Sequence, residues 1–154
     1  MSLEKMSDVR YQLFVVDAFS GDSVPVHLMT VQAIKLYRSR LAHNGIILFH
    51  TSNRYIRYDA VLAKTAFAAG ACVYYKNYQV ASTTIFPSTW IAVTWDKLEA
   101  EKLVSELDWE RIDPAWVKKI RPWTDQSSTI LPFIRSEGLL EGIDKITKVF
   151  KLRP

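Results

Sequence analysis

The stretch of sequence that decides the fold is residues 11–49, YQLFVVDAFSGDSVPVHLMTVQAIKLYRSRLAHNGIILF. Residues 11–16 form a nearly continuous apolar run, which is typical of a strand buried on both faces of a parallel sheet. Residues 28–41 carry apolar side chains at spacings of mostly three and four, which predicts an amphipathic helix. We expect the Asn-Gly pair at residues 44–45 to end this helix with a positive φ, and residues 46–49 to form a second buried strand.

Strands and helices continue to alternate after residue 49. Strands that alternate with helices of this length indicate βαβ units, so we expect an α/β fold with a mainly parallel sheet and right-handed crossovers. The last two strands are expected to form an antiparallel hairpin around a turn at Pro87 and Ser88, and Gly70 is expected to close the second helix. The further elements are expected as strands at residues 72–75, 83–86 and 90–95 and as helices at residues 59–69 and 96–107.

The chain has 154 residues, which predicts one folded domain. We expect residues 1–10 to be an N-terminal remnant or tag and residues 11–137 to form the domain. Residues 138–154 read as a C-terminal helical tail, because Leu139, Ile143, Ile146 and Phe150 fall on one helix face.

The composition excludes several classes of protein. Hydrophobic residues make up 49% and charged residues 23%, which is ordinary for a globular domain and excludes disorder as the main state. The single cysteine, Cys72, excludes a disulfide scaffold. No apolar run approaches the ~18 residues of a membrane span, and the first ten residues are polar. We therefore expect a cytoplasmic protein, with no membrane contact by this segment.

The net charge of +4 comes from 20 Lys and Arg against 16 Asp and Glu. The densest basic stretches, at residues 118–121 and 145–153, are both interrupted by apolar residues. This pattern favours solvated helix faces over a nucleic-acid site, and no nucleic acid is expected as a partner. An anionic partner stays open as the less favoured alternative.

The candidate site lies in the loops that follow the first two strands, because ligands of open α/β sheets bind outside the carboxyl ends of strands. Asp17 directly ends the first apolar strand. A carboxylate in that position lies partly in a low dielectric, where it can bind a cation or accept a proton from an amine. The alternative is that Asp17 accepts hydrogen bonds from backbone N–H groups of its own loop.

Four other polar residues near these strand ends each have two interpretations. Asp22 would add a second negative charge for a cationic substrate, or it caps the next turn. His27 either begins a helix or contacts a ligand, and His50 is either a packed, hydrogen-bonded side chain or a catalytic one. Asn53 and its neighbour Arg54 either orient a substrate or close the turn.

Two kinds of site are not expected. The three histidines are far apart in the sequence and no HxxxH or CxxC occurs, so no metal site is predicted. The chain contains no GxSxG motif and no GxGxxG motif, so neither a nucleophile elbow nor a glycine-rich cofactor loop is visible.

Many residues of the first 55 fit one recurring pattern. They are Asp17, Ala18, Phe19, Ser20, Asp22, Pro25, His27, Leu28, Thr30, Leu36, Tyr37, Leu41, Gly45, His50, Ser52, Asn53, Arg54 and Tyr55. A later block holds Trp123-Thr124-Asp125 followed by Ile130-Leu131-Pro132. The first set resembles strand-DAFSxDxxPxHLxTxExxxLYxxxLxxxGxxxxHxSNRY, a pattern of the spermidine synthase-like (polyamine aminopropyltransferase) branch of the class I S-adenosylmethionine-dependent methyltransferase fold. The later block resembles the WTDD-x-x-N-LLP motif of that branch, with Gln126 in place of the second Asp and Thr129 in place of Asn.

The resemblance implies a Rossmann-like class I methyltransferase sheet that is partial and holds the later strands. The strand that ends at Asp17 would be the fourth strand of the family sheet. The glycine loop and the ribose-binding acid of the earlier strands are not visible in this sequence. We therefore expect the chain to supply the acceptor-side half of the domain and to be inactive alone.

The resemblance also implies roles for individual residues. Asp17 stands where the family has the carboxylate that deprotonates and orients the attacking amine. The donor would be S-adenosylmethionine or decarboxylated S-adenosylmethionine, with no metal, and the acceptor a small-molecule amine. The substrate-binding residues would be Asp22, His27, Tyr55, Trp123 and Asp125, and the cofactor-binding residues Ala18 and Phe19.

A second hypothesis is a degenerate, non-catalytic module of the same fold that dimerises or binds a protein partner. It is motivated by the missing cofactor half. An exposed sheet edge would then need a cover, and a homodimer is the simplest one.

Overall fold

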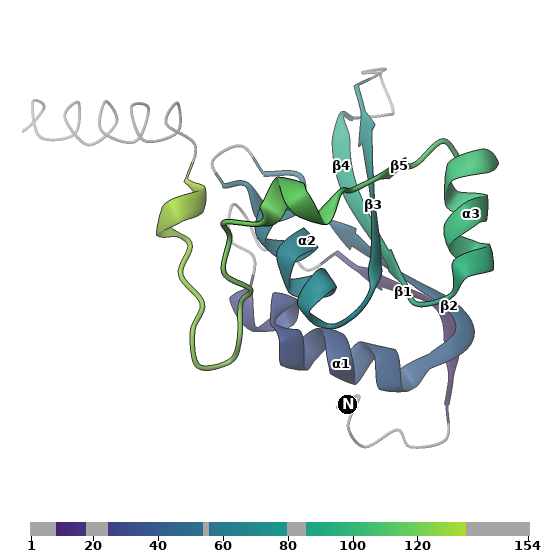
Figure 1. Ribbon diagram of the computed structural model, residues 1–154, viewed down its shortest axis with the longest axis horizontal. Coiled ribbons are helices and arrows are strands. Elements are labelled where there is room, and N and C mark those ends of the chain that lie inside the picture. The colour runs from purple at the N-terminus through teal and green to yellow at the C-terminus, as the bar shows by residue number, and fades with distance from the viewer. Residues whose placement is uncertain (1–8, 18–24, 54–55, 80–85, 135–154) are drawn as a thin grey trace, which may run out of the picture.

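The fold is a five-stranded sheet with helices on both faces (Figure 1). The computed structural model describes residues 9–17, 25–53, 56–79 and 86–134. The strands lie side by side in the order β1-β2-β4-β3-β5. They are β1 (Tyr11–Val16), β2 (Leu41–His50), β3 (Cys72–Tyr78), β4 (Ser88–Thr94) and β5 (Glu110–Arg111).

The sheet is mixed. Strand β1 pairs with β2 in parallel, and β4 lies between β2 and β3, antiparallel to both. It follows that β1, β2 and β3 all run in the same direction. The predicted α/β class is therefore confirmed, and the parallel order is interrupted by one inserted strand and by the short antiparallel β5.

The antiparallel hairpin is present, but the predicted turn was wrong. Ser88 belongs to β4 and pairs with Tyr78 at the end of β3, so the hairpin is formed by β3 and β4. The predicted strand at residues 83–86 lies outside the described residues except for Phe86, which is not in a strand. A short Pro-Ser dipeptide indicated a turn where the ladder with β3 in fact begins.

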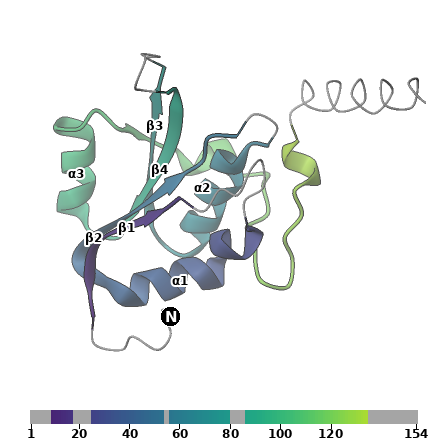
Figure 2. The same cartoon turned by 180° about the vertical axis from the view of Figure 1, so that it is seen from behind.

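Two helices cover one face of the sheet and one helix lies on the other (Figures 1 and 2). Alternate strand residues, among them Ile47, Phe49 and Val73, pack in one core with α1 and α2. The residues next to them along the strands, such as Tyr74, pack toward Leu103 of α3. The helical elements are η2 (Val26–Met29), α1 (Val31–Arg40), α2 (Tyr58–Ala68), α3 (Lys97–Ser105), η3 (Pro114–Val117) and η4 (Leu131–Phe133).

The predicted helix at residues 28–41 is divided at Thr30. The 3-10 turn η2 precedes Thr30, and α1 follows it. The Thr30 side chain accepts a hydrogen bond from the N–H of Ala33 at 3.2 Å, so it is the N-cap of α1. The apolar periodicity continued through a capping residue, and for that reason the sequence suggested a single helix.

Gly45 does not end α1, contrary to the prediction. The helix ends at Arg40, Leu41 is already extended, and Gly45 lies within β2. A side chain at Gly45 would collide with the Leu41 side chain and come within 3.0 Å of the carbonyl oxygen of Tyr11. Glycine is therefore needed here for close packing, whereas Gly70, with a φ of +77°, closes α2 as predicted.

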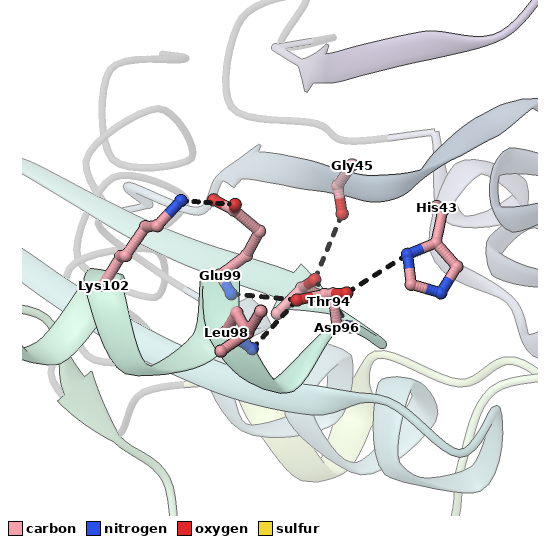
Figure 3. A network of polar contacts seen from close by, with 7 residues as sticks. All are labelled: His43, Gly45, Thr94, Asp96, Leu98, Glu99 and Lys102. Atoms are coloured by element: carbon pink, nitrogen blue, oxygen red, sulfur yellow. Dashed lines mark hydrogen bonds and ion pairs between the residues drawn. The ribbon is translucent and has the colours of Figure 1, made fainter.

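The start of α3 is fixed by a polar network that joins three elements (Figure 3). The Asp96 carboxylate accepts hydrogen bonds from the N–H groups of Leu98 at 2.9 Å and Glu99 at 3.0 Å. The Glu99 N–H is the main reason that the pKa of Asp96 lies below its ordinary value. His43 approaches Asp96 at 3.3 Å, and the Thr94 hydroxyl donates to the carbonyl of Gly45 at 3.1 Å, so α3, β4 and β2 are tied together.

Two parts of the predicted organisation, residues 1–10 and the helical tail at 138–154, lie almost wholly outside the described residues. Within the part of the chain that the structure describes, no helix is long and apolar enough to cross a membrane.

A buried hydrogen bond joins the C-terminal segment to the helical layer. The backbone N–H of Trp123 donates to the Thr65 hydroxyl of α2 at 3.0 Å, and that hydroxyl donates to the carbonyl of Val61 at 2.8 Å. Thr65 is fully buried and Trp123 is 2% exposed, so water cannot replace the hydroxyl. The Trp123 carbonyl accepts from the N–H of Val31 at 2.9 Å, which brings α1 into the same junction.

We predict that Thr65→Val lowers the free energy of unfolding by about 1–3 kcal/mol, because the buried N–H of Trp123 loses its acceptor. The measurement is urea unfolding followed by circular dichroism. Thr65→Ser is the matched control, because it keeps the hydroxyl and removes only a methyl group worth about 0.8 kcal/mol. If Thr65→Val proved as stable as Thr65→Ser, the hydrogen bond would not be what holds the segment.

Candidate functional site

The pairing of the first two strands brings Asp17 and His50 together. Val16 pairs with Phe49 in the parallel ladder, so the residues that follow them emerge side by side at the carboxyl edge of the sheet. The Nδ1 atom of His50 lies 3.0 Å from Oδ1 of Asp17. The Asp17 side chain is 52% exposed and that of His50 is 23% exposed, so the pair is open to solvent on the carboxylate side.

A hydrogen-bond chain continues behind His50. Its Nε2 atom lies 2.8 Å from Oγ of Ser52, and that oxygen accepts a hydrogen bond from the N–H of Thr89 at 2.7 Å. Since the Thr89 N–H can only donate, the Ser52 hydroxyl proton is available for Nε2 of His50. The arrangement favours the tautomer in which Nδ1–H of His50 donates to Asp17.

The imidazole plane is held by an indole. Trp90 pairs directly with His50 across β2 and β4, and the two rings stack with centroids 4.7 Å apart and planes inclined by 25°. The Trp90 Nε1–H donates to Oγ of Ser88 at 3.1 Å, which fixes the indole in turn. Stacking and two hydrogen bonds therefore set both the position and the orientation of His50.

The backbone alternative for Asp17 concerns its own loop, whose residues 18–24 lie outside the described residues, so both interpretations of Asp17 stay predictions. Among the described residues, no backbone N–H donates to its carboxylate, and Oδ2 has no hydrogen-bond partner. The partner that the structure gives Asp17 is the His50 side chain. Among the described residues, Oδ1 therefore has a hydrogen-bond partner and Oδ2 has none.

The structure gives Asn53 the turn-closing contact that the sequence suggested as one of two possibilities. Its Oδ1 atom accepts a hydrogen bond from the N–H of Ile56 at 2.8 Å. This contact shapes the beginning of the connection from β2 to α2.

Two predicted substrate-binding residues, His27 and Asp125, lie around the start of α1. The Thr30 hydroxyl is 2.6 Å from Oδ1 of Asp125 and 3.4 Å from the carbonyl of His27. The N–H of Asp125 donates to Oε1 of Gln32 at 3.3 Å, and the His27 side chain is exposed on η2. A role for these residues in substrate binding stays a prediction.

Trp123 is part of the hydrophobic core. Its Nε1–H donates to the carbonyl of Thr129 at 3.1 Å, and its ring meets those of Tyr58 and Phe133 edge to face. The indole therefore offers little surface to a cationic chain in this conformation, since it is 2% exposed. The remaining predicted site residues, Ala18, Phe19, Asp22 and Tyr55, lie outside the described residues, as does Arg54.

Sequence reasoning missed Ser52 and Trp90 as partners of His50, and Thr89 as the partner of Ser52. Ser52 could have been found, because the spacing of two residues in a strand end places it near His50. Thr89 and Trp90 come from β4, and nothing local in the sequence gives their register against β2. Across the described ranges, no cluster of three or more His, Cys, Asp or Glu side chains is placed to hold a metal ion.

Comparison with known proteins gives likenesses of fold at low identity. No protein-family model matches the chain, and no curated protein matches it. MNMC2 from Aquifex aeolicus matches with 15% sequence identity and a TM-score of 0.43, over 75% of this chain and 38% of that one. A probable spermidine synthase from Corynebacterium glutamicum ATCC 13032 matches with 13% identity and a TM-score of 0.48, over 82% of this chain and 53% of that one. The chain thus spans 38% and 53% of the lengths of these two proteins.

We predict that His50 carries its proton on Nδ1 at pH 8, because Ser52 donates to Nε2 and Asp17 accepts from Nδ1. Long-range ¹H–¹⁵N correlation spectra distinguish the two tautomers. In Ser52→Ala the Nε2 atom loses its donor, and the population of the Nε2–H tautomer should rise. A native spectrum with the proton on Nε2 would contradict this hydrogen-bond direction, and Ser39→Ala, a serine on the outside of α1, serves as the control.

Proposed function

We propose that this chain supplies the acceptor-side half of a spermidine synthase-like transferase, which moves an aminopropyl or methyl group from an S-adenosyl sulfonium donor to an amine. The observation that carries the proposal is the Asp17 carboxylate, which is half exposed at the carboxyl edge of the sheet and hydrogen-bonded to His50 at 3.0 Å. The sequence patterns around Asp17 and His50, and the position of both residues at paired strand ends, support it.

The charges at this edge suit a cationic group. Asp17 supplies a negative charge. The neighbouring imidazole of His50 is hydrogen-bonded to the hydroxyl of Ser52. An amine and a sulfonium are both attracted to an exposed carboxylate. The described residues therefore fit the amine and the sulfonium end of the donor.

In the proposed reaction the donor supplies an alkyl carbon activated by the sulfonium. The amine nitrogen forms a bond to that carbon as the carbon–sulfur bond breaks, and the electron pair remains on sulfur. Oδ2 of Asp17 orients the amine and takes its proton, while Oδ1 stays bonded to His50. The main contribution of the chain is thus to hold the acceptor nitrogen in line and to provide a place for one proton.

His50 acts as a positioning residue in this proposal. Its Nδ1–H holds Oδ1 of Asp17, and the Trp90 stack prevents the imidazole from turning. The other carboxylate oxygen of Asp17, Oδ2, is thereby directed to one side. Without His50 the carboxylate of an exposed loop residue would sample several rotamers.

We predict that Asp17→Asn lowers kcat for group transfer by about 10²–10⁴-fold, because the amide cannot accept the amine proton. The assay uses the full-length protein that carries this chain, with S-adenosylmethionine and decarboxylated S-adenosylmethionine offered in turn to a panel of amines, and mass spectrometry of the products. His50→Asn should lower kcat less than Asp17→Asn does and leave KM for the donor unchanged.

The control for this experiment is Asp113→Asn, since Asp113 is an exposed aspartate whose carboxylate caps η3. Retained transfer in Asp17→Asn, with an unchanged melting temperature, would remove Asp17 from the reaction. A protein that transfers neither group to any amine would contradict the proposed activity itself.

A second candidate function is a non-catalytic module that dimerises, and one observation favours it. Strand β1 lies at the end of the sheet, and its Leu13 and Val15 side chains are 52% and 53% exposed. No other described residue pairs with the outer edge of β1. An apolar edge strand of this kind readily pairs with a second copy of itself.

We predict from this candidate that the chain sediments as a dimer and that Leu13→Glu converts it to a monomer, because a charge on β1 opposes edge pairing. Sedimentation velocity over a concentration series measures the state. Leu98→Glu is the matched control, because Leu98 is an exposed leucine on α3, 69% accessible and away from β1. A wild-type monomer at every concentration would exclude the module that dimerises through β1.

A further inference from the structure

A cavity of about 480 Å³ lies between the start of α2 and the C-terminal segment, and neither the sequence patterns nor the proposed reaction assigns it a role. Its volume falls within the range of about 300–1,000 Å³ that small-molecule sites occupy. Its floor is apolar and aromatic, and its other lining residues are basic or small and polar. The apolar lining is Ala60, Ile120, Pro122, Trp123, Pro132, Phe133 and Ile134.

The walls of the cavity are held by backbone hydrogen bonds. Ile56 and Ile134 form a bridge, and the N–H of Arg57 donates to the carbonyl of Phe133 at 2.9 Å. On the floor, the indole N–H of Trp123 donates to the carbonyl of Thr129 at 3.1 Å. The cavity therefore exists before any ligand arrives, which reduces the ordering that binding requires.

The charged side chains among the described lining residues are all positive. They are Arg57, Lys119 and Arg121, and no described Asp or Glu lines the cavity. Within the described residues, the side chains of Lys119 and Arg121 have no ion pair or hydrogen bond. Arg57 is engaged elsewhere, because it forms an ion pair of 3.8 Å with Asp59 and its guanidinium lies over the Trp116 ring, 5.5 Å from the ring centroid. Lys119 and Arg121 are therefore the cations that the lining offers to a ligand.

We propose that this cavity binds a small amphiphilic anion, an aromatic or aliphatic body that carries a carboxylate or phosphate group. The apolar body would lie on Pro122, Pro132 and Phe133, while the anionic group would meet the ammonium of Lys119 and the guanidinium of Arg121 at the rim. A cationic polyamine would be repelled by the same two side chains. The cavity is therefore a site of different chemistry from the carboxylate edge at Asp17, and it does not depend on the proposed transferase activity.

Titration followed by NMR tests the site, with the Trp123 indole N–H signal as the reporter, because that group lies in the lining. The probes are phenyl phosphate, benzoate, inorganic phosphate and phenol, each added to the complete chain. We expect phenyl phosphate or benzoate to bind at least about tenfold more tightly than inorganic phosphate or phenol, since only they combine both chemistries. Binding of just one of the first two probes identifies the anionic group that the site prefers.

The variant is the double substitution Lys119→Gln and Arg121→Gln, which should raise the dissociation constant of the aromatic anion by about tenfold or more. Both side chains are exposed, so the substitution does not disturb the core. Lys118→Gln is the matched control, because Lys118 is an exposed neighbour that does not line the cavity. The proposal is overturned if neither aromatic anion moves the Trp123 signal, if inorganic phosphate or phenol binds as tightly, or if the double variant binds as the control does.

Discussion

The parallel pairing of β1 with β2 determines where the polar groups of the candidate site lie. Because Val16 is paired with Phe49, the chain leaves the two strands at the same level, and Asp17 meets His50. A shift of one residue in this register would direct the side chains to opposite faces of the sheet. The core residues Ile47 and Phe49, both almost fully buried, oppose such a shift. The geometry of the site is therefore maintained by hydrophobic packing on the strands.

The same packing supports a series of hydrogen-bonded polar side chains at the edge of the sheet. Asp17, His50 and Ser52 each have a partner, and the series ends on the backbone N–H of Thr89. Polar groups that are fully paired in this way rigidify their surroundings, whereas a single missing partner leaves a costly unsatisfied atom. No buried side-chain nitrogen or oxygen among the described residues lacks a hydrogen bond. The hydrogen-bonded side chains behind it thus hold the exposed carboxylate of Asp17 in a fixed position.

Local sequence patterns predicted the individual strands and helices. They failed where a residue's role depends on contacts with segments far away in the sequence. The strands at residues 11–16 and 46–49 and the helix at 59–69 were recognisable because apolar runs and helical periodicity are local signals. The predicted burial of residues 11–16 on both faces was wrong, because β1 lies at the end of the sheet and its Leu13 and Val15 are about half exposed. Gly45 was misread, because the need for glycine there comes from the way the chain packs in β2, against the Leu41 side chain and the carbonyl of Tyr11 on the neighbouring strand. The stack of Trp90 on His50 could not be predicted, since it depends on the register of β4 against β2.

The insertion of β4 between β2 and β3 has a consequence for biosynthesis. The Ser52 hydroxyl accepts a hydrogen bond from the N–H of Thr89, which lies 37 positions later in the chain. His50 stacks on Trp90, the residue after Thr89. A nascent chain that has left the ribosome only as far as α2 holds Asp17 and His50 but lacks the strand that orients them. The candidate site is consequently completed only after the β3–β4 hairpin has docked, long after Asp17 has been translated.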